Sequence, residues 1–464
     1  MKLTSVLLLH WLPLLYGGVS AQGNVSAVFD DPITGYLNQP QVTQNFGQSS
    51  PFFSLAQNNS DATPPGCTIT QAHILSRHGA RFPTKGKTTT IKTALAKVSL
   101  ALTNATGSLT GDFAFLNTFN YSLGQDNLTG FGQQELFNSG IKFAKRYEAA
   151  GKGLAPFVRA AGSPRVEESA LNFTMGWNSV VAASALIDGG SILVISEEEG
   201  VNNTLHVESC PAFENTAPFN ELGDTEDQIW IDIFAPPIRD RLNANIPGAN
   251  FDVNDTVAMM DLCPFETVAT PTGEISPVCK LFTDDEFVSY SFLQSVDKFF
   301  GDGPGNKFGS SQGAGFVNEL LARMTNTAVQ DQTSTNTTLD SQNATFPLGL
   351  ALYADFSHDK QMISIMTAMG LFNGSVSLGG LKSTDRQTSV TSGFSVAKLT
   401  PFSARMYFEK MTCEGSAEEM VRVLVNDAVQ PLEFCGGDAL GRCTLTKFVE
   451  SQGVAKSGGA FSEC

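Results

Sequence analysis

Two stretches of this chain share one plan, in which an apolar strand runs into a polar cluster. Residues 68–75 (TITQAHIL) have the β-branched, apolar character of a buried strand and lead into residues 76–84 (SRHGARFPT). Residues 348–356 (LGLALYADF) lead in the same way into residues 357–359 (SHD), and a helical pattern follows at residues 361–371. In an open α/β sheet, ligands bind at the carboxyl ends of the strands, so both clusters can meet in one crevice. The two stretches therefore predict an α/β fold with a central, mainly parallel sheet flanked by helices.

The first cluster has the composition of an anion-binding site. His78 lies between Arg77 and Arg81, and each guanidinium offers a planar fork that matches the oxygens of a phosphate group. Gly79 allows the backbone to approach a ligand closely, and Pro83 fixes the direction in which the chain leaves. An Arg-His-Gly tripeptide alone is equally consistent with a basic turn on the surface. The longer Arg-His-Gly-x-Arg-x-Pro string is much more specific.

A third arginine follows another expected strand. Residues 155–161 (APFVRAA) are predicted to be a strand, after which Ser163 caps a helix that has Pro164 as its first residue. Arg165 then lies in the first helical turn, where a cation opposes the helix dipole. A bound anion, held by both the arginine and the helix end, is one reason to place an arginine there. A surface arginine is the alternative.

The remaining patterns divide the chain into a discontinuous α/β domain and an inserted lobe. Residues 22–200 and 337–464 carry the strand signals and are expected to form the catalytic domain, whereas helical patterns dominate residues 201–336, which are expected to form a smaller α-rich lobe. The glycine-rich residues 309–315 lack the Gly-Lys-Ser/Thr ending of a nucleotide-binding loop and are expected to lead into a helix at residues 316–324. Further helices are expected at residues 91–102 and 129–149, and further strands at residues 191–196, 403–411 and 420–425.

The N-terminus has the pattern of a secretory signal peptide. Residues 1–21 combine Lys2, a largely apolar stretch and a small-residue cleavage site, which predicts a secreted, extracellular protein. No other stretch is long and apolar enough to span a membrane, so no membrane partner is expected. The 464 residues carry a formal charge of −17, and loss of Lys2 makes the mature chain still more negative. This charge argues against nucleic acid as a partner, because the phosphate backbone would be repelled.

Cysteine and histidine usage favours disulfides over metal. All eight cysteines lie outside residues 1–21, and an even number in an exported chain favours four disulfides, although eight cysteines cannot be paired from spacing alone. There is no Cys-x-x-Cys pair and few histidines remain after cleavage, so no metal site is expected. Asn-x-Ser/Thr acceptors predict heavy glycosylation; they are Asn24, Asn58, Asn104, Asn120, Asn127, Asn172, Asn202, Asn254, Asn336, Asn343 and Asn373.

The string at residues 77–84 (RHGARFPT) resembles the phosphate pocket of the histidine acid phosphatases and is most similar to that of secreted fungal phytases, with the basidiomycete-type 6-phytases as the candidate subgroup. Residues 132–136 (GQQEL), 353–359 (YADFSHD) and the tail at 441–464 extend the resemblance over nearly the whole mature chain. It implies a histidine phosphatase-like fold with the inserted α-rich domain. It also implies a monomeric acid phosphomonoesterase that hydrolyses phytate (myo-inositol hexakisphosphate) without metal or cofactor.

The resemblance and the chemistry of the side chains assign roles to the two clusters. Three arginines stabilise the transferring phosphoryl group, neutral His78 attacks phosphorus to give a phosphohistidine, and Asp359 protonates the leaving alcohol. The expected phosphate-binding residues are Arg77, Arg81, Arg165 and His358. Candidates for further substrate contacts are Thr84, Lys85, Lys87, Arg159, Lys298 and Lys360. The disulfides that the resemblance implies are Cys67–Cys413, Cys210–Cys464, Cys263–Cys279 and Cys435–Cys443.

Two departures from the family pattern bear on the substrate. Lys360 stands where the family usually has an asparagine after His-Asp, and Asp297-Lys298 stands where many relatives have two lysines. A histidine acid phosphatase of broad specificity is therefore the main alternative, and a non-catalytic protein that binds phosphate ligands is a second. A phosphoglycerate mutase also uses an Arg-His-Gly site, but the predicted export, the cysteines and the glycosylation acceptors argue against it.

Overall fold

The computed structural model describes residues 30–37, 41–56, 61–104, 107–207, 209–270, 272–372, 381–386 and 393–464. The expected signal peptide and the acceptors Asn24, Asn58 and Asn373 lie outside these residues. The centre of the molecule is an eight-stranded sheet with the order β10-β8-β7-β3-β6-β4-β5, in which β9 also pairs with β8. Its strands are β3 (Cys67–Arg77), β4 (Phe157–Ala161), β5 (Leu193–Ile195), β6 (Leu352–Ser357), β7 (Arg405–Cys413), β8 (Met420–Val425), β9 (Ala428–Val429) and β10 (Arg442–Thr444).

The sheet has a parallel half and an antiparallel half. Strands β3, β6, β4 and β5 pair in parallel, whereas β7 is antiparallel to β3, and β8 is antiparallel to β7, β9 and β10. The α/β class is confirmed, but the expectation of a mainly parallel sheet is wrong in this detail. Only a short connection joins β7 to β8, and such a connection allows an antiparallel pair, whereas a parallel pair needs a long crossover.

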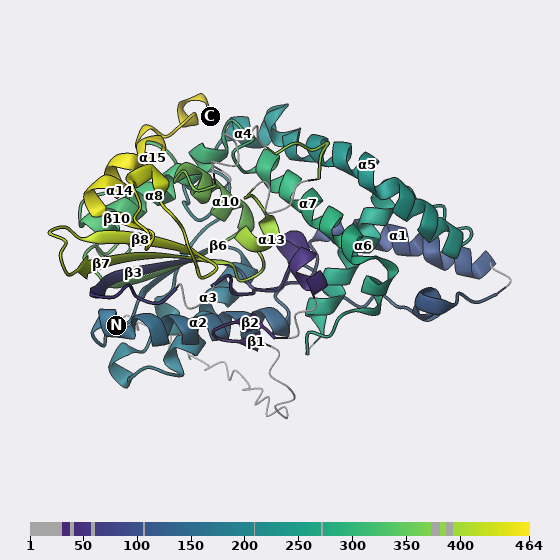
Figure 1. Cartoon of the computed structure of the whole chain (residues 1–464), viewed down its shortest axis with the longest axis horizontal. Coiled ribbons are helices and arrows are strands. Elements are labelled where there is room, and N and C mark those ends of the chain that lie inside the picture. The colour runs from purple at the N-terminus through teal and green to yellow at the C-terminus, as the bar shows by residue number, and fades with distance from the viewer. Residues whose placement is uncertain are drawn as a thin grey trace, which may run out of the picture.

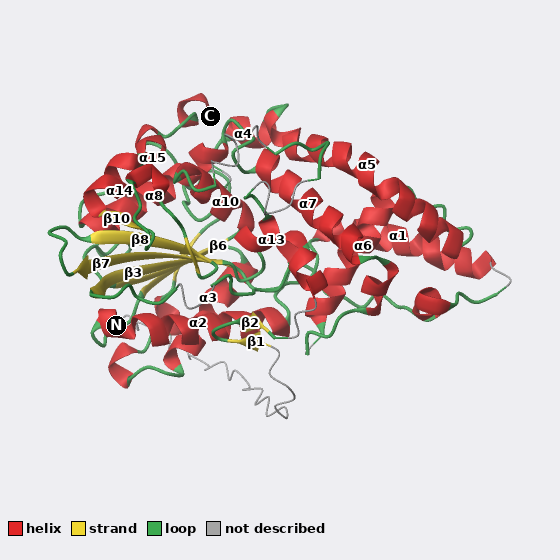
Figure 2. Cartoon of the chain, in the orientation of Figure 1, coloured by secondary structure: helices red, strands yellow, loops and turns green. Residues whose placement is uncertain are grey.

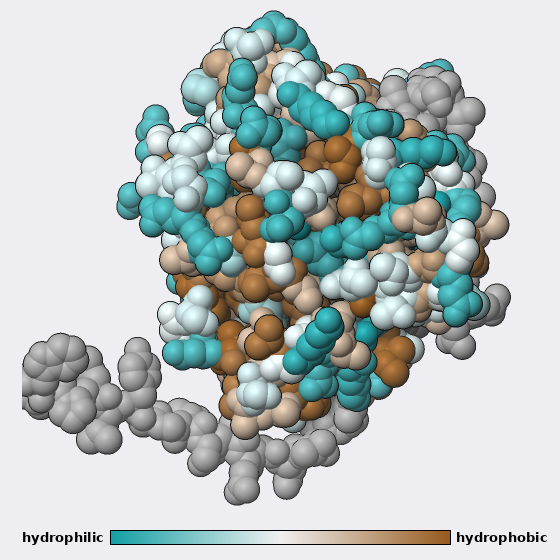
Figure 3. Space-filling view, turned by 90° about the vertical axis from the view of Figure 1, so that its left-hand side faces the viewer, coloured by the Kyte–Doolittle hydropathy of each residue, from teal (hydrophilic) through white to brown (hydrophobic). Residues whose placement is uncertain are grey.

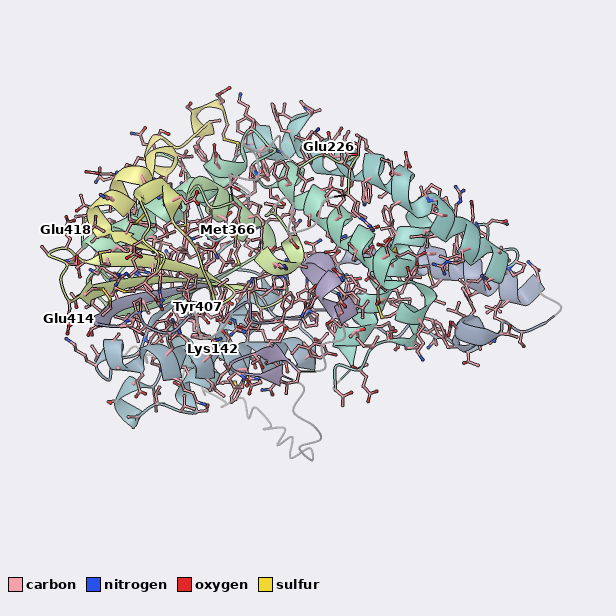
Figure 4. The ribbon with its side chains drawn as sticks, viewed as in Figure 1. Lys142, Glu226, Met366, Tyr407, Glu414 and Glu418 are labelled. Carbon is pink, nitrogen blue, oxygen red and sulfur yellow. A yellow bond between two sulfur atoms is a disulfide. The ribbon has the colours of Figure 1, made fainter. Side chains whose placement is uncertain are left out.

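Helices cover both faces of the sheet (Figure 1). On one face lie α2 (Gly130–Gly151) and α3 (Pro164–Asn178), and on the other lie α8 (Gly309–Thr325) and α10 (Asp359–Ala368). Neighbouring residues of β7 point to opposite faces, as alternation in a strand requires. The ring of Tyr407 packs against Phe143 and Tyr147 of α2, whereas that of Phe408 packs against Phe316 of α8. Figure 4 shows the same separation, with Tyr407 on the α2 side of the sheet and Met366 of α10 on the other side.

A helical lobe extends from one end of the sheet domain (Figure 2). Its helices are α5 (Leu222–Asn245), α6 (Val253–Ala269) and α7 (Asp284–Gly301), joined by α1 (Lys85–Asn104), which packs on α6. In the lobe core Trp230 stacks on Phe234 and meets Phe292 edge-on. The expected range of 201–336 omits α1 and includes α8, which packs on α10 beside the sheet. The domain boundaries at these positions stay a prediction.

The glycine-rich residues 309–315 lie inside α8 and do not form a loop before it. The expected helix start at residue 316 is therefore wrong by about two turns. Close packing of α8 against α10 explains the glycines, because a Cβ atom on Gly313 would lie 2.2 Å from the carbonyl oxygen of Ser364. The glycines lower the helix propensity of α8, but they allow its backbone to lie close to that of α10.

Short elements complete the chain around this frame. They are β1 (Asp30–Asp31), β2 (Gly35–Tyr36), α4 (Pro211–Asn215), α9 (Thr337–Asp340), α13 (Val396–Leu399), α14 (Leu445–Ser451) and α15 (Gly453–Ser457), with short 3-10 turns between them. All eight cysteines form disulfides, in the pairs that the family resemblance implies. Cys67–Cys413 joins β3 to β7, and Cys210–Cys464 ties the C-terminal residue to the start of α4.

Hydrophobic and hydrophilic residues are mixed on the surface that is visible in Figure 3. Within the described residues no helix is long and apolar enough to cross a membrane. Most of the described glycosylation acceptors are exposed, as glycan attachment requires, although their occupancy stays a prediction; these are Asn104, Asn120, Asn127, Asn202, Asn254 and Asn343. Asn172 and Asn336 are half-buried.

Candidate active site

The two sequence clusters meet where the parallel strands end. Arg77 of β3 and Ser357 of β6 are paired in register, so His78 and His358 follow on adjacent strands. The backbone N–H of His78 donates to the carbonyl of Ser357 at 3.0 Å, and the two imidazole rings lie edge-to-face with centroids 5.6 Å apart. Asp359 comes next and is the first residue of α10. The topology therefore brings His78, His358 and Asp359 into one place.

Three arginines surround His78. Arg77 is buried, with its Nη1 donating to the carbonyls of Thr400 at 2.7 Å and of Gln48, and its guanidinium lies 4.7 Å from the ring centroid of Phe402. Arg81 follows in the loop, and its Nη1 donates to a backbone carbonyl at 2.9 Å.

Arg165 enters from the first turn of α3, after Ser163 and Pro164 as expected, and its Nη2 lies 3.4 Å from Nδ1 of His358. Burial and the neighbouring guanidiniums of Arg77 and Arg165 lower the pKa of Arg81 to about 9. Mutual repulsion of this kind is relieved when an anion binds among the cations.

The arginine cluster also holds unused hydrogen-bond donors. The Nε atoms of Arg77, Arg81 and Arg165 are buried and have no hydrogen-bond partner among the described residues. A buried N–H without a partner costs free energy, so the cluster is suited to a ligand with several acceptor oxygens. A tetrahedral phosphate or phosphoryl group has that chemistry.

The hydrogen bonds of His78 fix its tautomer. Its Nδ1 lies 2.9 Å from the carbonyl oxygen of Gly79, which can only accept, so Nδ1 carries the proton and Nε2 keeps its lone pair. Burial, and then Arg77, Arg81 and Arg165, hold the pKa of His78 well below its usual range. His78 therefore stays neutral in acid, as a nucleophile must.

The GQQEL motif supports the loop that carries His78. Glu135 is buried and accepts the backbone N–H of Ala80 and that of Phe52, each at 2.9 Å. The loop lies so close to α2 that a Cβ atom on Gly79 would be 2.4 Å from the carbonyl oxygen of Gly132. The resemblance pointed to this motif, but its function in holding the loop follows only from the three-dimensional contacts.

Asp359 lies between two cations. Its Oδ1 is 3.6 Å from Nη2 of Arg77, and its Oδ2 is 3.6 Å from Nζ of Lys298. Burial alone would raise the pKa of Asp359, but Arg77 and Lys298 more than compensate and hold it well below its usual range. In the free protein Asp359 is consequently a carboxylate.

Lys298 is a buried part of this arrangement. Its Nζ also lies 3.0 Å from Asp297 and 3.4 Å from Asp302, so three carboxylates share one ammonium group. Lys298 is among the candidates for a substrate contact, but it is buried and its charge acts on Asp359. The sequence did not indicate this burial, because Lys298 carries no local pattern that separates it from a surface lysine on α7.

Glu197 is a site residue that the sequence analysis missed. It lies just after β5, and its Oε1 is 2.7 Å from Nε2 of His358. The carboxylate accepts the Nε2–H, which leaves Nδ1 of His358 facing Arg165. The rule that site residues follow the carboxyl ends of parallel strands could have pointed to Glu197, as it did to His78 and His358.

The other candidate substrate contacts are dispersed. Thr84 accepts the N–H of Lys87 at 3.4 Å where α1 begins, and Lys85 is exposed on the first turn of that helix. Lys87 pairs with Asp261 at 2.7 Å. Lys360 is exposed and lines a cavity of about 460 Å³ that is also lined by carboxylates of the lobe and its flanks; these are Glu214, Asp224, Asp297 and Asp302.

Arg159 is engaged elsewhere. It is fully buried on β4, and its guanidinium donates to Asp355 at 2.7 Å and to Glu319 at 2.6 Å. Two buried carboxylates need a cation between them, which accounts for the arginine. We therefore leave Arg159 out of the proposed substrate contacts.

Comparisons with known proteins agree with this geometry. The family model described as histidine phosphatase superfamily (branch 2) matches residues 68–426, which include both clusters. Phytase A of Aspergillus awamori is 44% identical over 439 residues, covering 93% of this chain and 92% of the relative. Phytase A of Aspergillus fumigatus is 43% identical over 480 residues, covering 99% of each chain.

Solved structures share the fold. The phytase from D. castellii superimposes with a TM-score of 0.71 at 21% identity, covering 92% of this chain and 90% of that one. A multiple inositol polyphosphate phosphatase of Bifidobacterium longum, in complex with inositol hexasulfate, gives a TM-score of 0.60 at 13% identity and covers 89% and 98%. The chain is a phosphoric monoester hydrolase that belongs to branch 2 of the histidine phosphatase superfamily.

Proposed function

We propose that this chain is a secreted acid phosphomonoesterase that hydrolyses phytate to lower inositol phosphates and phosphate through a phosphohistidine intermediate. The observation that carries the proposal is a neutral His78, with its Nε2 lone pair available, inside a cluster of three arginines that have unused donors. The names of the relatives, Phytase A, support phytate as the substrate. Four disulfides and the leader-like N-terminus support export.

In the first step, Arg77, Arg81 and Arg165 bind the oxygens of the phosphate that is cleaved. Their fixed charges stabilise the negative charge of the transferring group without reorganisation during the reaction. Nε2 of His78 attacks phosphorus, a P–N bond forms, and the P–O bond to the inositol oxygen breaks. The alcohol leaves with a proton from Asp359.

Asp359 must gain that proton before it can give it. The free site holds the carboxylate form because Arg77 and Lys298 are close. A bound phosphate dianion cancels the charge of Arg77 and adds negative charge nearby. Both effects raise the pKa of Asp359, so that its carboxylate can take up a proton. After the alcohol leaves, the carboxylate accepts a proton from the water that opens the phosphohistidine.

His358 completes the phosphate site beside His78 and Arg165. In the free protein its Nε2–H is held by Glu197. A proton taken up at Nδ1 would let His358 donate to a phosphate oxygen, and Glu197 would stabilise the imidazolium ion. His358, supported by the Glu197 carboxylate, thus becomes a hydrogen-bond donor to the phosphate in acid.

The choice between phytate and smaller esters depends on groups outside the arginine cluster. Lys87 and Lys298 are each paired with carboxylates, whereas Lys85 and Lys360 are exposed and can meet the other phosphates of phytate, although carboxylates also line the cavity beside Lys360. An experiment that compares kcat/KM for phytate and for an aryl phosphate tests the proposal. We expect phytate to be preferred at acidic pH. A preference for the aryl ester would favour the broad acid phosphatase instead.

A further inference from the structure

A second cluster of ligating side chains lies beside the phosphate site. It consists of Glu197, His206 and His358, whose carboxylate and ring nitrogen atoms all lie within 4.8 Å of one another. Nε2 of His358 is 2.7 Å from Oε1 of Glu197, and Nδ1 of His206 is 3.9 Å from Oε2 of the same carboxylate. The rings of His206 and His358 are edge-to-face, with centroids 5.6 Å apart. The proposed reaction uses His358 and Glu197 but has no step for His206.

Two histidines and one carboxylate form a ligand set typical of zinc. Zinc bonds of about 2.0–2.2 Å in a tetrahedral site place neighbouring ligand atoms ~3.3 Å apart. The two separations from the Glu197 carboxylate, 2.7 Å and 3.9 Å, lie on either side of that value. Small side-chain rotations would therefore bring the three groups around one ion, since no two of these ligand atoms are more than 4.8 Å apart.

Access to the cluster is open enough for an ion to enter. The side chains of Glu197, His206 and His358 are 18%, 15% and 9% exposed, so the site is sheltered but reaches solvent. Three protein ligands leave a fourth zinc position for a water molecule or for a phosphate oxygen. Arg165, whose Nη2 is 3.4 Å from Nδ1 of His358, opposes a cation there and limits its affinity.

We propose that Glu197, His206 and His358 bind one zinc ion, and that this ion inhibits the enzyme. The ion takes the place of the proton that Nε2 of His358 shares with Glu197, and that proton is transferred through solvent to Nδ1, so the ring stays neutral and no proton is released overall. The imidazole then carries its proton on Nδ1, toward the phosphate site. A divalent charge and an added N–H donor beside this site retain the product phosphate, which slows turnover. The site is regulatory, and its occupation does not depend on phytate being the substrate.

His206→Asn tests the site without altering the groups that hold phosphate. The chain is first freed of metal with a chelator and then titrated with zinc near neutral pH by calorimetry. Glu198→Gln is the matched control, because Glu198 is an exposed carboxylate next to Glu197. We expect one equivalent of zinc in the unmodified chain and in Glu198→Gln, with affinity at least about tenfold weaker in His206→Asn. No binding, or equal affinity in all three proteins, overturns the site.

Turnover of an aryl phosphate gives the second readout, because phytate itself chelates metal. Zinc should lower kcat of the unmodified chain and of Glu198→Gln over the concentration range in which calorimetry shows binding. His206→Asn should keep most of its activity under the same zinc concentrations. Binding that depends on His206 without any loss of turnover overturns the inhibitory function. Activity of the metal-free chain reports separately on the proposed phosphatase reaction.

Discussion

At the scale of single residues, the account depends on His78 as the nucleophile. We expect His78→Ala to abolish turnover of every phosphate ester, because the arginines that hold the phosphate are cations, which cannot attack phosphorus, and Nε2 of His358 is engaged by Glu197. The fold should persist, since Ala keeps the backbone bonds of His78 to Ser357 and Ser403. Initial rates and thermal unfolding of the purified variant check both points. Residual turnover above that of an empty preparation would contradict the nucleophile role.

Asp359 is tested by the leaving group. We expect Asp359→Asn to slow hydrolysis of alkyl esters such as phytate much more than the first step with aryl esters, because an aryl oxide leaves without a proton. Pre-steady-state release of the aryl alcohol measures that first step. Losses of equal size on both classes of ester would remove Asp359 from the acid role.

The residues of the site were not equally visible in the sequence. His78, His358 and Asp359 follow strands that have clear apolar patterns, so their meeting could be predicted from the rule for parallel sheets. Glu197 follows β5, a strand of only three residues. It lies in a run of acidic residues, which is typical of a segment exposed to solvent. The burial of Lys298 depends on how the end of α7 meets the start of α10, and no local pattern encodes that contact.

At the scale of elements, the contact between α8 and α10 fixes the helix that begins with Asp359. We expect Gly313→Ala to reduce the free energy of unfolding by about 1–3 kcal/mol, because a Cβ atom there meets the backbone of Ser364. The turnover number should also fall, since α10 must shift. Gly130→Ala is the control, because a Cβ atom on Gly130 meets no atom within 4 Å. Equal stability of the two variants in denaturant titrations would contradict this packing argument.

The contact of α2 with the His78 loop makes stability depend on pH. Burial, and then the nearby Asp30, raise the pKa of Glu135 from 4.5 to about 8. The folded chain thus holds a proton that the unfolded chain releases above 4.5, so stability should fall as pH rises from about 4.5 to about 8.

Glu135→Gln should be less stable in acid but lose less stability over that interval, because glutamine does not titrate. Unfolding midpoints in urea at several pH values measure both slopes. A variant slope as steep as that of the unmodified chain would rule out Glu135 as the source.

The same elements show where sequence patterns reach their limit. The strand at residues 420–425 is found at Met420–Val425, because its run of β-branched and other apolar residues is a local signal. The expectation of a mainly parallel sheet and the expected start of α8 are wrong, because the pairing of β7 with β3 and the packing of α8 on α10 depend on neighbours distant in sequence. The extent of the lobe shows the same limit. Helix α1 directly follows the loop that carries His78 in the sequence, yet it packs on α6, which comes much later in the chain.

At the scale of the whole molecule, the formal charge of −17 repels a polyphosphate unless the site is locally positive. We expect KM for phytate to rise more steeply with salt than KM for an aryl phosphate, because salt screens the exposed Lys85 and Lys360. Lys85→Ala with Lys360→Ala should reduce this difference. Each exposed pair contributes only ~0.2–1 kcal/mol, so the expected change in KM is severalfold.

A control with the same change of charge separates local from overall electrostatics. Lys447 and Lys456 are exposed on α14 and α15, at the end of the molecule remote from α1 (Figure 1). Replacing both by alanine should leave the salt dependence unchanged. If phytate and the aryl ester respond to salt alike in the unmodified enzyme, the locally positive site is absent and the broad acid phosphatase is favoured.

The central claim is covalent transfer of the phosphoryl group to His78, and trapping that intermediate tests it most directly. Asp359→Asn is mixed with an aryl phosphate, denatured in alkali, in which a P–N bond survives, and digested for mass spectrometry. Phosphate on His78 is the result that we predict, with the signal rising during the first turnover and absent from Asp359→Asn combined with His78→Ala. A burst of aryl alcohol with His78 unmodified, or with phosphate on another residue, would contradict the account.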